Sequence, residues 1–216
     1  TIDVMTEDQK VEQTAKLDIL NAARTLFAKK GFEAVSVREI AKESNQNISM
    51  ISYYFGSKEG LYKYILSDHM TTVGGEVRKI FQGYLDKEMT PKLFRSELKL
   101  LITVIVEMKC GNAEMISIMQ RERVDGLPFA RALHEQTIEP IAEQVIDVFK
   151  LAQKKKIIRT GFDVSAFFGI LFESIVGYMT SNECGLRVLK GSYDLPKDKD
   201  KFIEFLTDLF LQGIKK

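Results

Sequence analysis

Two serines and two tyrosines lie close together in the stretch NISMISYYF, residues 47–55. On a helix, Ser49, Ser52 and Tyr53 fall at positions i, i+3 and i+4, so they share one face. Ile51 falls on another face, which we expect to be buried. Hydroxyl groups donate hydrogen bonds to phosphate oxygens, and small serines let a helix approach another surface closely. This face therefore predicts contacts with the phosphates of a nucleic acid.

Two helices are predicted ahead of this face. The first runs from residue 14 to Lys30, with apolar residues at three- and four-residue steps, cations in its last turn and Gly31 as its stop. Ser36 followed by Glu39 forms a capping box, which predicts a short second helix.

A four-residue turn, 44–47, separates the second helix from a third predicted at 48–55. Asn45 tolerates a left-handed backbone, and Asn47 can cap the third helix. A helix, a tight turn and a short helix with a polar face are the arrangement by which a helix-turn-helix enters the major groove of DNA.

The composition fits a globular protein with one large or two small domains, since 45% of its 216 residues are hydrophobic. The whole chain carries a net charge of +1, but residues 14–64 hold eight Lys or Arg against five Asp or Glu, a net +3. Residues 1–13 carry a net −3 and are predicted to form a flexible leader. The longest apolar runs are shorter than the roughly 20 residues of a spanning helix, so we expect no membrane span and a cytoplasmic location.

Motifs of enzymes and metal sites do not fit this sequence. His134 and Glu135 open an H-E-x-x-H pattern, but Ile138 occupies the place of the second histidine. Cys110 and Cys184 match no metal-ligand spacing, and GSKEG lacks the pattern of a phosphate-binding loop. We therefore expect no enzyme activity, no catalytic residue, no metal site and no cofactor.

The stretch ILNAARTLFAKKGFEAVSVREIAKESNQNISMISYYFGSKEGLY, residues 19–62, resembles the DNA-binding domain of the TetR family of bacterial transcriptional regulators. The similarity rests on the Ala-Ala and Leu-Phe pairs of the first helix, on Gly31-Phe32, on Ser36-Val37 with Ile40-Ala41, and on the segment YYF followed by SKE and Leu61. It implies an all-α fold, with a three-helix DNA-binding domain at 14–60 and a larger helical domain at 61–216 for effector binding and dimerisation.

The resemblance also implies roles for individual residues. Arg38 occupies a position that often reaches a base, although a solvated surface position is an alternative. The residues implied at DNA are Ser36, Arg38, Asn47, Ile48, Ser49, Met50, Ser52, Tyr53, Tyr54 and Lys58, with Lys58 at the position of a phosphate-binding lysine. Asn45 and Gln46 depart from the usual Gly-Val of the turn. Ile48 and Met50 replace commoner polar residues and could contact thymine methyl groups, unless Ile48 belongs to the core.

Helical periodicity dominates the rest of the chain. Helices are predicted at 60–84, 93–109, 112–124, 128–154, 163–181 and 199–213, with a loop at 182–198. Pro140 should kink or split the fourth of these.

The helix SAFFGILFESIVGYMTS is apolar on nearly every side, which indicates burial both inside the subunit and against a partner. Together with the final helix, KFIEFLTDLFLQGI, it predicts a homodimer, as the resemblance also implies. The expected interface residues are Ser165, Gly169, Phe172, Gly177, Phe202, Phe205 and Leu209.

Methionine and aromatic side chains of the second domain suit an adaptable apolar pocket, although each could equally be ordinary core. The candidates are Phe81, Tyr84, Met108, Met115, Met119, Phe129, Leu133, Phe172 and Tyr178. Charged residues beside apolar runs could orient a polar group of an effector or form internal ion pairs: Glu107, Arg121, Glu122 and Glu173.

The resulting hypothesis is a repressor that leaves a palindromic operator in double-stranded DNA when a small apolar or amphipathic effector binds. The alternatives are a transcriptional activator, a ligand-binding dimer without DNA function, and a helical enzyme that depends on His134.

Overall fold

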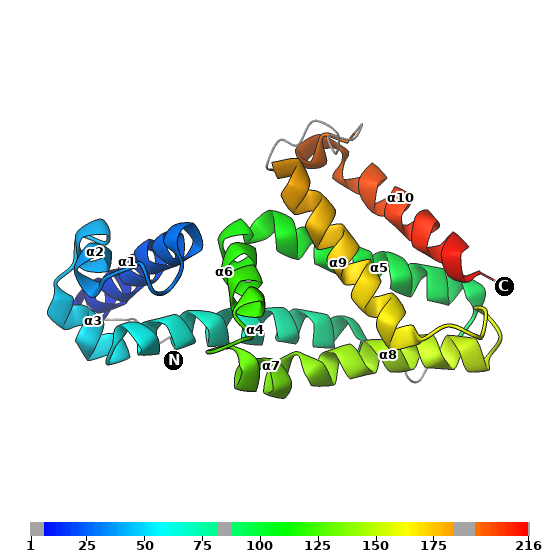
Figure 1. Ribbon diagram of the computed structural model, residues 1–216, viewed down its shortest axis with the longest axis horizontal. Coiled ribbons are helices and arrows are strands. Elements are labelled where there is room, and N and C mark those ends of the chain that lie inside the picture. The colour runs from blue at the N-terminus through cyan, green and yellow to red at the C-terminus, as the bar shows by residue number, and fades with distance from the viewer. Residues whose placement is uncertain (1–6, 82–87, 184–192, 216) are drawn as a thin grey trace. The chain divides into compact units, whose positions relative to one another are not determined.

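A computed structural model describes residues 7–81, 88–183 and 193–215, without the side chains of 7–11, 79–81, 183 and 196. Within these ranges the chain forms helices and one isolated antiparallel bridge between Ile158 and Lys215, and it has no strand (Figure 1). The prediction of an all-α fold is confirmed.

Ten helices are formed by the described residues: α1 Glu7–Lys30, α2 Val37–Glu43, α3 Ile48–Phe55, α4 Lys58–Phe81, α5 Pro91–Gly111, α6 Ala113–Val124, α7 Arg131–Thr137, α8 Glu139–Lys154, α9 Val164–Glu183 and α10 Leu195–Ile214.

The helix bounds follow the predictions closely in the middle of the chain and less well at its ends. α1 begins at Glu7, so residues 7–13 of the expected flexible leader are helical. The long helix predicted at 128–154 is split at Ile138, two residues before Pro140, because the proline ring and its missing N–H prevent a continuous helix. α10 begins earlier than predicted, but its backbone is non-helical at Asp198.

Two compact units share the chain. The first contains residues up to Val73 and residues 112–138, and the second contains residues 74–111 and 139 onward. The boundary after Val73 lies inside α4. This division by contacts differs from the predicted division by function at residue 60, which stays a prediction.

The first unit has its own apolar core. Ile19 of α1, Ile40 of α2, Ile51 of α3 and Leu61 of α4 are fully buried together. Ile118 of α6 belongs to the same core, and α6 packs on α1 of the predicted DNA-binding domain. These helices therefore gain a support that lies far along the sequence.

Polar contacts also fasten α6 to the second half of α1. They come from one face of α6, at positions three and four residues apart. The three contacts are Thr25 Oγ1 donating to Glu114 Oε1 at 2.7 Å, Ser117 Oγ donating to the carbonyl of Ala28 at 3.1 Å, and an Arg121 guanidinium N–H donating to the carbonyl of Lys29 at 3.3 Å.

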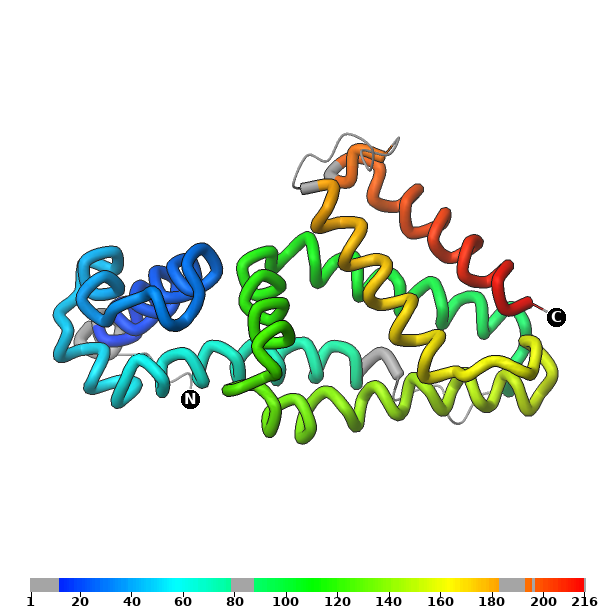
Figure 2. The backbone as a smooth tube through the Cα atoms, in the orientation of Figure 1, coloured from blue at the N-terminus to red at the C-terminus, as the bar shows by residue number. Residues whose placement is uncertain are grey.

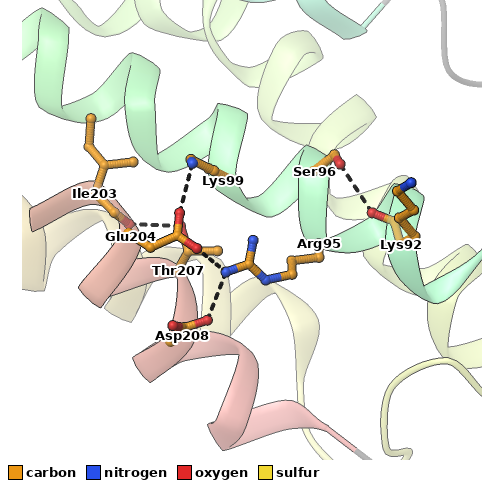
Figure 3. Close-up of polar contacts among 8 residues, drawn as sticks. All are labelled: Lys92, Arg95, Ser96, Lys99, Ile203, Glu204, Thr207 and Asp208. Atoms are coloured by element: carbon orange, nitrogen blue, oxygen red, sulfur yellow. Dashed lines mark hydrogen bonds and ion pairs between the residues drawn. The ribbon is translucent and has the colours of Figure 1, made fainter. Parts of the chain in front are cut away.

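The second unit is built around α5, whose buried residues include Phe94, Leu98 and Ile102. Both α9 and α10 pack on α5, and α8 packs on α9. Figure 2 traces these four backbones. Ion pairs line the contact between α5 and α10: Arg95 with Glu204 and Asp208, and Lys99 with Glu204 (Figure 3). Glu107 of α5 also pairs with Lys199 of α10.

One described segment, Val164–Asn182, is long and apolar enough to span a membrane. Length and composition alone decide little here, because core helices of water-soluble proteins pass the same test.

Candidate nucleic-acid interface

The turn between α2 and α3 has the geometry of a tight helix-to-helix connection. Asn45 adopts a positive φ of 53°, as its sequence position predicts. The amide of Gln46 reaches back to the carbonyl of Ala41 at 2.9 Å. The buried hydroxyl of Ser44 donates to the carbonyl of Ile40 at 2.8 Å. These bonds use backbone groups of the last turn of α2 and fix the direction of α3.

Side-chain caps start both helices at the predicted residues. Ser36 Oγ accepts from the amide of Glu39 at 3.2 Å, and Asn47 Oδ1 accepts from the amide of Ser49 at 3.1 Å. Lys30 pairs with the Glu39 carboxylate and, together with the amide of Ser36, holds the pKa of Glu39 below its usual value. The predicted capping box is confirmed.

α3 presents two chemically different faces. Ile51 is completely buried, whereas 74% of Tyr53 and 42% of Ile48 are exposed. Ser49 and Ser52 are exposed beside them. The alternative that Ile48 belongs to the core is therefore wrong, and the exposed face carries hydroxyls, a phenol and one branched apolar side chain.

Seven of the ten residues predicted at DNA are exposed, and three are partly buried. The exposed set is Ser36, Arg38, Asn47, Ile48, Ser49, Ser52 and Tyr53, all on α2, α3 or their caps. Met50 and Tyr54 instead pack against the core of the first unit.

Tyr54 is engaged within the chain. Its hydroxyl donates to the backbone carbonyl of Glu12 on α1 at 3.2 Å. Burial, and then the nearby charge of Glu12, raise the pKa of the Tyr54 phenol. The ring of Tyr53 packs at 5.1 Å against that of Tyr54, so Tyr54 supports the exposed tyrosine from behind.

Lys58, the third partly buried residue, also makes contacts within the chain. Its Nζ donates to the carbonyls of Phe32 at 2.9 Å and Val35 at 3.0 Å. The same ammonium lies 4.1 Å from the centre of the Phe32 ring. These contacts could not be predicted from local sequence patterns, because Phe32 and Val35 precede Lys58 by more than 20 residues.

The residues predicted to line an effector pocket are divided between the two units. Met115, Met119, Phe129 and Leu133 pack in or against the core of the first unit. Met108, Phe172 and Tyr178 are partly buried residues of the second unit. Tyr84 and the side chain of Phe81 lie outside the described residues. The pocket stays a prediction.

The four charged residues considered for that pocket have different surroundings. Glu107 pairs with Lys199, and Arg121 binds the end of α1. Glu122 is 3% exposed and lies in the first unit. Glu173 is exposed on α9.

Glu122 accepts three hydrogen bonds in the first unit. The donors are the Tyr62 hydroxyl at 3.1 Å, the amide of Phe129 at 3.1 Å and the amide of Ala130 at 3.0 Å. Burial, and then Glu122, raise the pKa of the Tyr62 phenol, which keeps this group a donor. Glu122 thus links α6 to α4 and to the start of α7.

Two buried charges of α5 were missed by sequence reasoning. Glu97 and Lys109 are 3% and 2% exposed. Both occur on the apolar side of α5. These two residues could have been found from the sequence, because each is a charged residue at a core-facing position of a helix. Burying a charge is costly without a partner, so such a position stands out.

The predicted dimer residues are mostly accessible in the single chain. Ser165, Gly169 and Gly177 are exposed on α9, and Phe205 and Leu209 are exposed on α10. Ile170 of α9 is also 64% exposed.

Two of the predicted dimer residues differ from this pattern. Phe202 is only 2% exposed and stacks on Tyr178 at 5.4 Å within its own unit, so it packs in the core of the single chain, and its place at the interface stays a prediction. Phe172 is partly buried.

Neither histidine belongs to a cluster of possible metal ligands. Within the described ranges, no group of three His, Cys, Asp or Glu side chains could hold a metal ion. His69 is half-buried, and burial followed by the charge of Arg24 lowers its pKa. His134 is half-buried on α7.

Comparisons with known proteins identify the helix-turn-helix. Residues 19–65 match the family described as bacterial regulatory proteins, tetR family. The HTH-type transcriptional regulator YvkB of Bacillus subtilis is 27% identical over 201 residues, covering 91% of this chain and 95% of YvkB. The HTH-type transcriptional repressor NicS of Pseudomonas putida is 24% identical over 206 residues, covering 92% of each chain.

Solved structures show the same fold. The fatty acid degradation regulator FadR from Bacillus halodurans superimposes with a TM-score of 0.67 at 16% identity, covering 92% of this chain and 95% of FadR. The helix-turn-helix and the family match agree: residues 19–65 form a DNA-binding domain of the TetR family of bacterial transcriptional regulators, and the chain is similar to HTH-type regulators over nearly its whole length.

Proposed function

We propose that this protein is a ligand-responsive transcriptional regulator that binds a palindromic operator as a homodimer. One observation carries the proposal: α3 buries Ile51 completely and turns hydroxyls and a tyrosine outward after a tight, well-capped turn. Such a face is largely exposed in its own unit, and it suits the major groove of DNA.

Phosphate contacts come from the hydroxyls of this face. Ser49 and Ser52 are small and exposed, and Tyr53 is also exposed. These groups set the position of the helix on the duplex rather than reading its sequence. Tyr54 acts indirectly, through the ring of Tyr53.

Base contacts come from two side chains. Arg38 is exposed on α2, and a guanidinium pairs well with guanine. Ile48 is exposed on α3 and can touch a thymine methyl group, whereas Met50 packs against the core. We therefore expect each half-site to contain both a G·C pair and an A·T pair.

Dimerisation uses the exposed face of α9 and α10. Ile170, Phe205 and Leu209 expose large apolar surface, and Gly169 and Gly177 allow close approach of a second helix. Two copies joined here would present two α3 helices to half-sites about 34 Å apart, one helical turn of DNA. Burial in a dimer also explains why Val164–Asn182 is so apolar in a cytoplasmic protein.

An effector is proposed to bind within the domain formed by residues 61–216 and to weaken DNA binding. Met108, Phe172 and Tyr178 are three of the partly buried side chains of the second unit. α4 begins directly after the DNA-binding helices and ends in the second unit, so a shift of α4 would change the separation of the two α3 helices. Release from the operator makes the protein a repressor, as the name of NicS states for that relative.

The experiment is selection of duplexes from a random-sequence DNA library with the full-length protein. Binding of the selected duplex is then measured by fluorescence anisotropy at several salt concentrations. We expect a palindromic consensus, a 2:1 complex of protein and duplex, and affinity that falls with salt because the Lys and Arg side chains of residues 14–64, which carry a net +3, displace counterions from the phosphates. Failure to enrich any sequence would support the ligand-binding dimer without DNA function.

In vitro transcription from a promoter carrying the selected duplex separates a repressor from an activator. We expect less transcript as protein is added. More transcript would show an activator instead.

A further inference from the structure

We propose that the second unit carries a separate surface that binds the phosphate backbone of double-stranded DNA without reading its sequence. This surface, the basic patch, consists of five exposed cations: Lys154, Lys155, Lys156, Arg159 and Lys215. The inference goes beyond the proposed function, because the helix-turn-helix belongs to the first unit.

Positive charge is more concentrated in the basic patch than at the helix-turn-helix. Residues 150–163 hold five Lys or Arg against one Asp, a net +4 in 14 residues. Residues 14–64 carry a net +3 in 51 residues. A cluster of Lys and Arg is the usual electrostatic sign of a surface that binds nucleic acid. The charge distribution therefore favours a second anion-binding surface outside the helix-turn-helix.

The fold adds the fifth cation of the patch from the end of α10. Ile158 and Lys215 form the isolated antiparallel bridge (Figure 1). Next to it, the amide of Arg159 donates to the carbonyl of Ile214 at 2.9 Å. These backbone contacts hold Lys215 beside the connection between α8 and α9. The basic patch therefore joins two segments that lie far apart in the sequence.

The cations of the basic patch are not neutralised by the chain itself. In the part of the chain that the structure describes, none of the five forms an ion pair with an Asp or Glu. Asp163, the one acid of the connection, instead accepts from the amide of Ala166 at 2.8 Å. By contrast, Lys197 of the same unit pairs with Asp194 at 3.0 Å. Cations without an acidic partner are available to displace counterions from phosphates.

The backbone holds the three lysines in a fixed turn. The amide of Ile157 donates to the carbonyl of Ala152 at 2.9 Å, which closes the end of α8. Lys156 adopts a positive φ of 57°, where glycine is the usual residue. A lysine at this angle costs about 1–2 kcal/mol relative to glycine. A charged residue kept at such a position favours a function for its side chain.

Arg159 is also held in place by its neighbours. Its carbonyl accepts from Gln153 Nε2 at 3.4 Å, and its guanidinium lies 5.6 Å from the centre of the Phe162 ring. A guanidinium on a ring face keeps its N–H donors for a bidentate contact with a phosphate.

Helix dipoles account for only part of the basic patch. Lys154 lies in the last turn of α8 and Lys215 follows α10, where a cation stabilises a helix by about 0.3–1 kcal/mol. The effect is confined to the last turn, and Arg159 lies well beyond the end of α8. The other cations of the patch therefore need another explanation.

Double-stranded DNA fits the basic patch better than a membrane or a single strand. Proteins that lie on a membrane insert apolar side chains, and those that bind single strands stack the bases on aromatic rings. Of the described residues in 150–163 and 211–215, none is an exposed large apolar side chain. Residues 19–65 form a DNA-binding domain, which brings the chain to DNA.

The test measures binding of a duplex of random sequence by fluorescence anisotropy at several salt concentrations. The patch variant carries Lys154→Gln and Lys155→Gln, which leave the turn at Lys156 unchanged. Thermal unfolding establishes that each variant is folded.

The matched control variant carries Lys197→Gln and Lys201→Gln. It removes the same charge from two exposed lysines of the same unit, which pair with Asp194 and Asp198. The two variants therefore differ in the place of the lost charges and not in the net charge of the chain.

The patch variant should lose about fivefold or more in affinity at low salt, and its slope of log affinity against log salt should fall by roughly two, since each phosphate contact contributes about 0.9. The control variant should lose less than about twofold, through the overall charge alone. An equal loss in both variants would show that only the net charge matters, and it would overturn the inference.

A variant of the helix-turn-helix separates this inference from the proposed function. Arg38→Ala with Tyr53→Ala weakens the exposed face of α2 and α3, and adding the patch substitutions should cause the same further loss, because the two surfaces act independently. If selection enriches no sequence but the patch variant still loses affinity for the random duplex, the proposed function fails and this inference stands. If the selected duplex is bound and the patch variant binds the random duplex like the unaltered protein, this inference fails alone.

Acetylation of lysines in the unaltered protein gives a result that does not depend on a variant folding. Mass spectrometry should show slower acetylation of Lys154, Lys155 and Lys156 when the random duplex is present, with unchanged rates at Lys197 and Lys201. Unchanged rates at all five lysines would contradict the proposal.

Vesicles that contain phosphatidylglycerol and a single-stranded oligonucleotide test the other anions at equal phosphate concentration. Both should bind the unaltered protein more weakly than the random duplex does. Stronger binding of either one, lost in the patch variant, would assign the basic patch to that partner and overturn the inference.

Discussion

α3 and α9 each leave one face exposed, and the two faces differ in chemistry. On α3 the exposed side carries Ser49, Ser52 and Tyr53, all with hydroxyls. On α9 it carries Gly169, Gly177 and the large apolar Ile170, and its exposed polar side chains are those of Ser165, Glu173 and Ser174. A hydroxyl face suits a charged, hydrated partner, whereas a face of small and apolar residues suits the dry surface of another protein. The kind of exposure therefore indicates the kind of partner.

The largest effect should come from a charge on the α9 face. Ile170→Glu would place a carboxylate in the proposed dimer interface and should give a monomer in sedimentation. Operator affinity should fall by about 100-fold or more, since one half-site is then bound without its linked twin.

Val124→Glu is the matched control for that change, because Val124 is an exposed valine of the first unit, outside the proposed interface. It should stay dimeric. If the unaltered protein were monomeric, or if Ile170→Glu stayed dimeric, the exposed face of α9 would not be the dimer interface.

The next largest effect should come from the buried Glu122 of the first unit rather than from the surface of α3. Glu122→Ala would leave three buried donors without their acceptor and should lower the free energy of unfolding by about 3 kcal/mol or more. Tyr62→Phe removes one of the three bonds and should cost about 1 kcal/mol. Urea unfolding of both variants measures the difference, and equal values would show that Glu122 does not act through all three bonds.

Arg38 and Tyr53 are expected to have different roles within the DNA-binding face. Arg38→Ala should lose about 1–3 kcal/mol on the selected duplex and relax the preference at one base pair. Tyr53→Ala should weaken all duplexes alike, because a phosphate is present in every sequence, and should leave the salt dependence nearly unchanged, because the phenol is uncharged. Anisotropy titrations on duplexes with single base changes distinguish the two, and identical profiles would remove the assignment of Arg38 to a base.

The smallest effect is expected in the turn before α3. Asn45→Ala forces a less tolerant residue to keep a φ of 53° and should lower the unfolding free energy by about 1 kcal/mol. Asn45→Gly should be neutral or stabilising. Thermal unfolding compares the two variants. Equal midpoints would show that the positive φ at residue 45 does not affect stability.

Local features of the DNA-binding helices could be predicted from the sequence. The caps at Ser36 and Asn47, the positive φ of Asn45 and the bounds of α3 all agree with the structure. Each depends on residues within four positions along the chain, so short-range rules suffice. The exposed face of α3 follows from the same periodicity.

Contacts between distant segments were decided only by the tertiary structure. Lys58 meets Phe32 and Val35, Phe202 is enclosed by its own unit, and α6 joins the core of the first unit. Periodicity shows that a residue is apolar or charged, but its partner depends on which helices pack together. The sequence thus determined the helices and the chemistry of their faces, while the packing of the chain decided which charges and aromatic rings remain free for a partner, because those contacts join residues far apart in sequence.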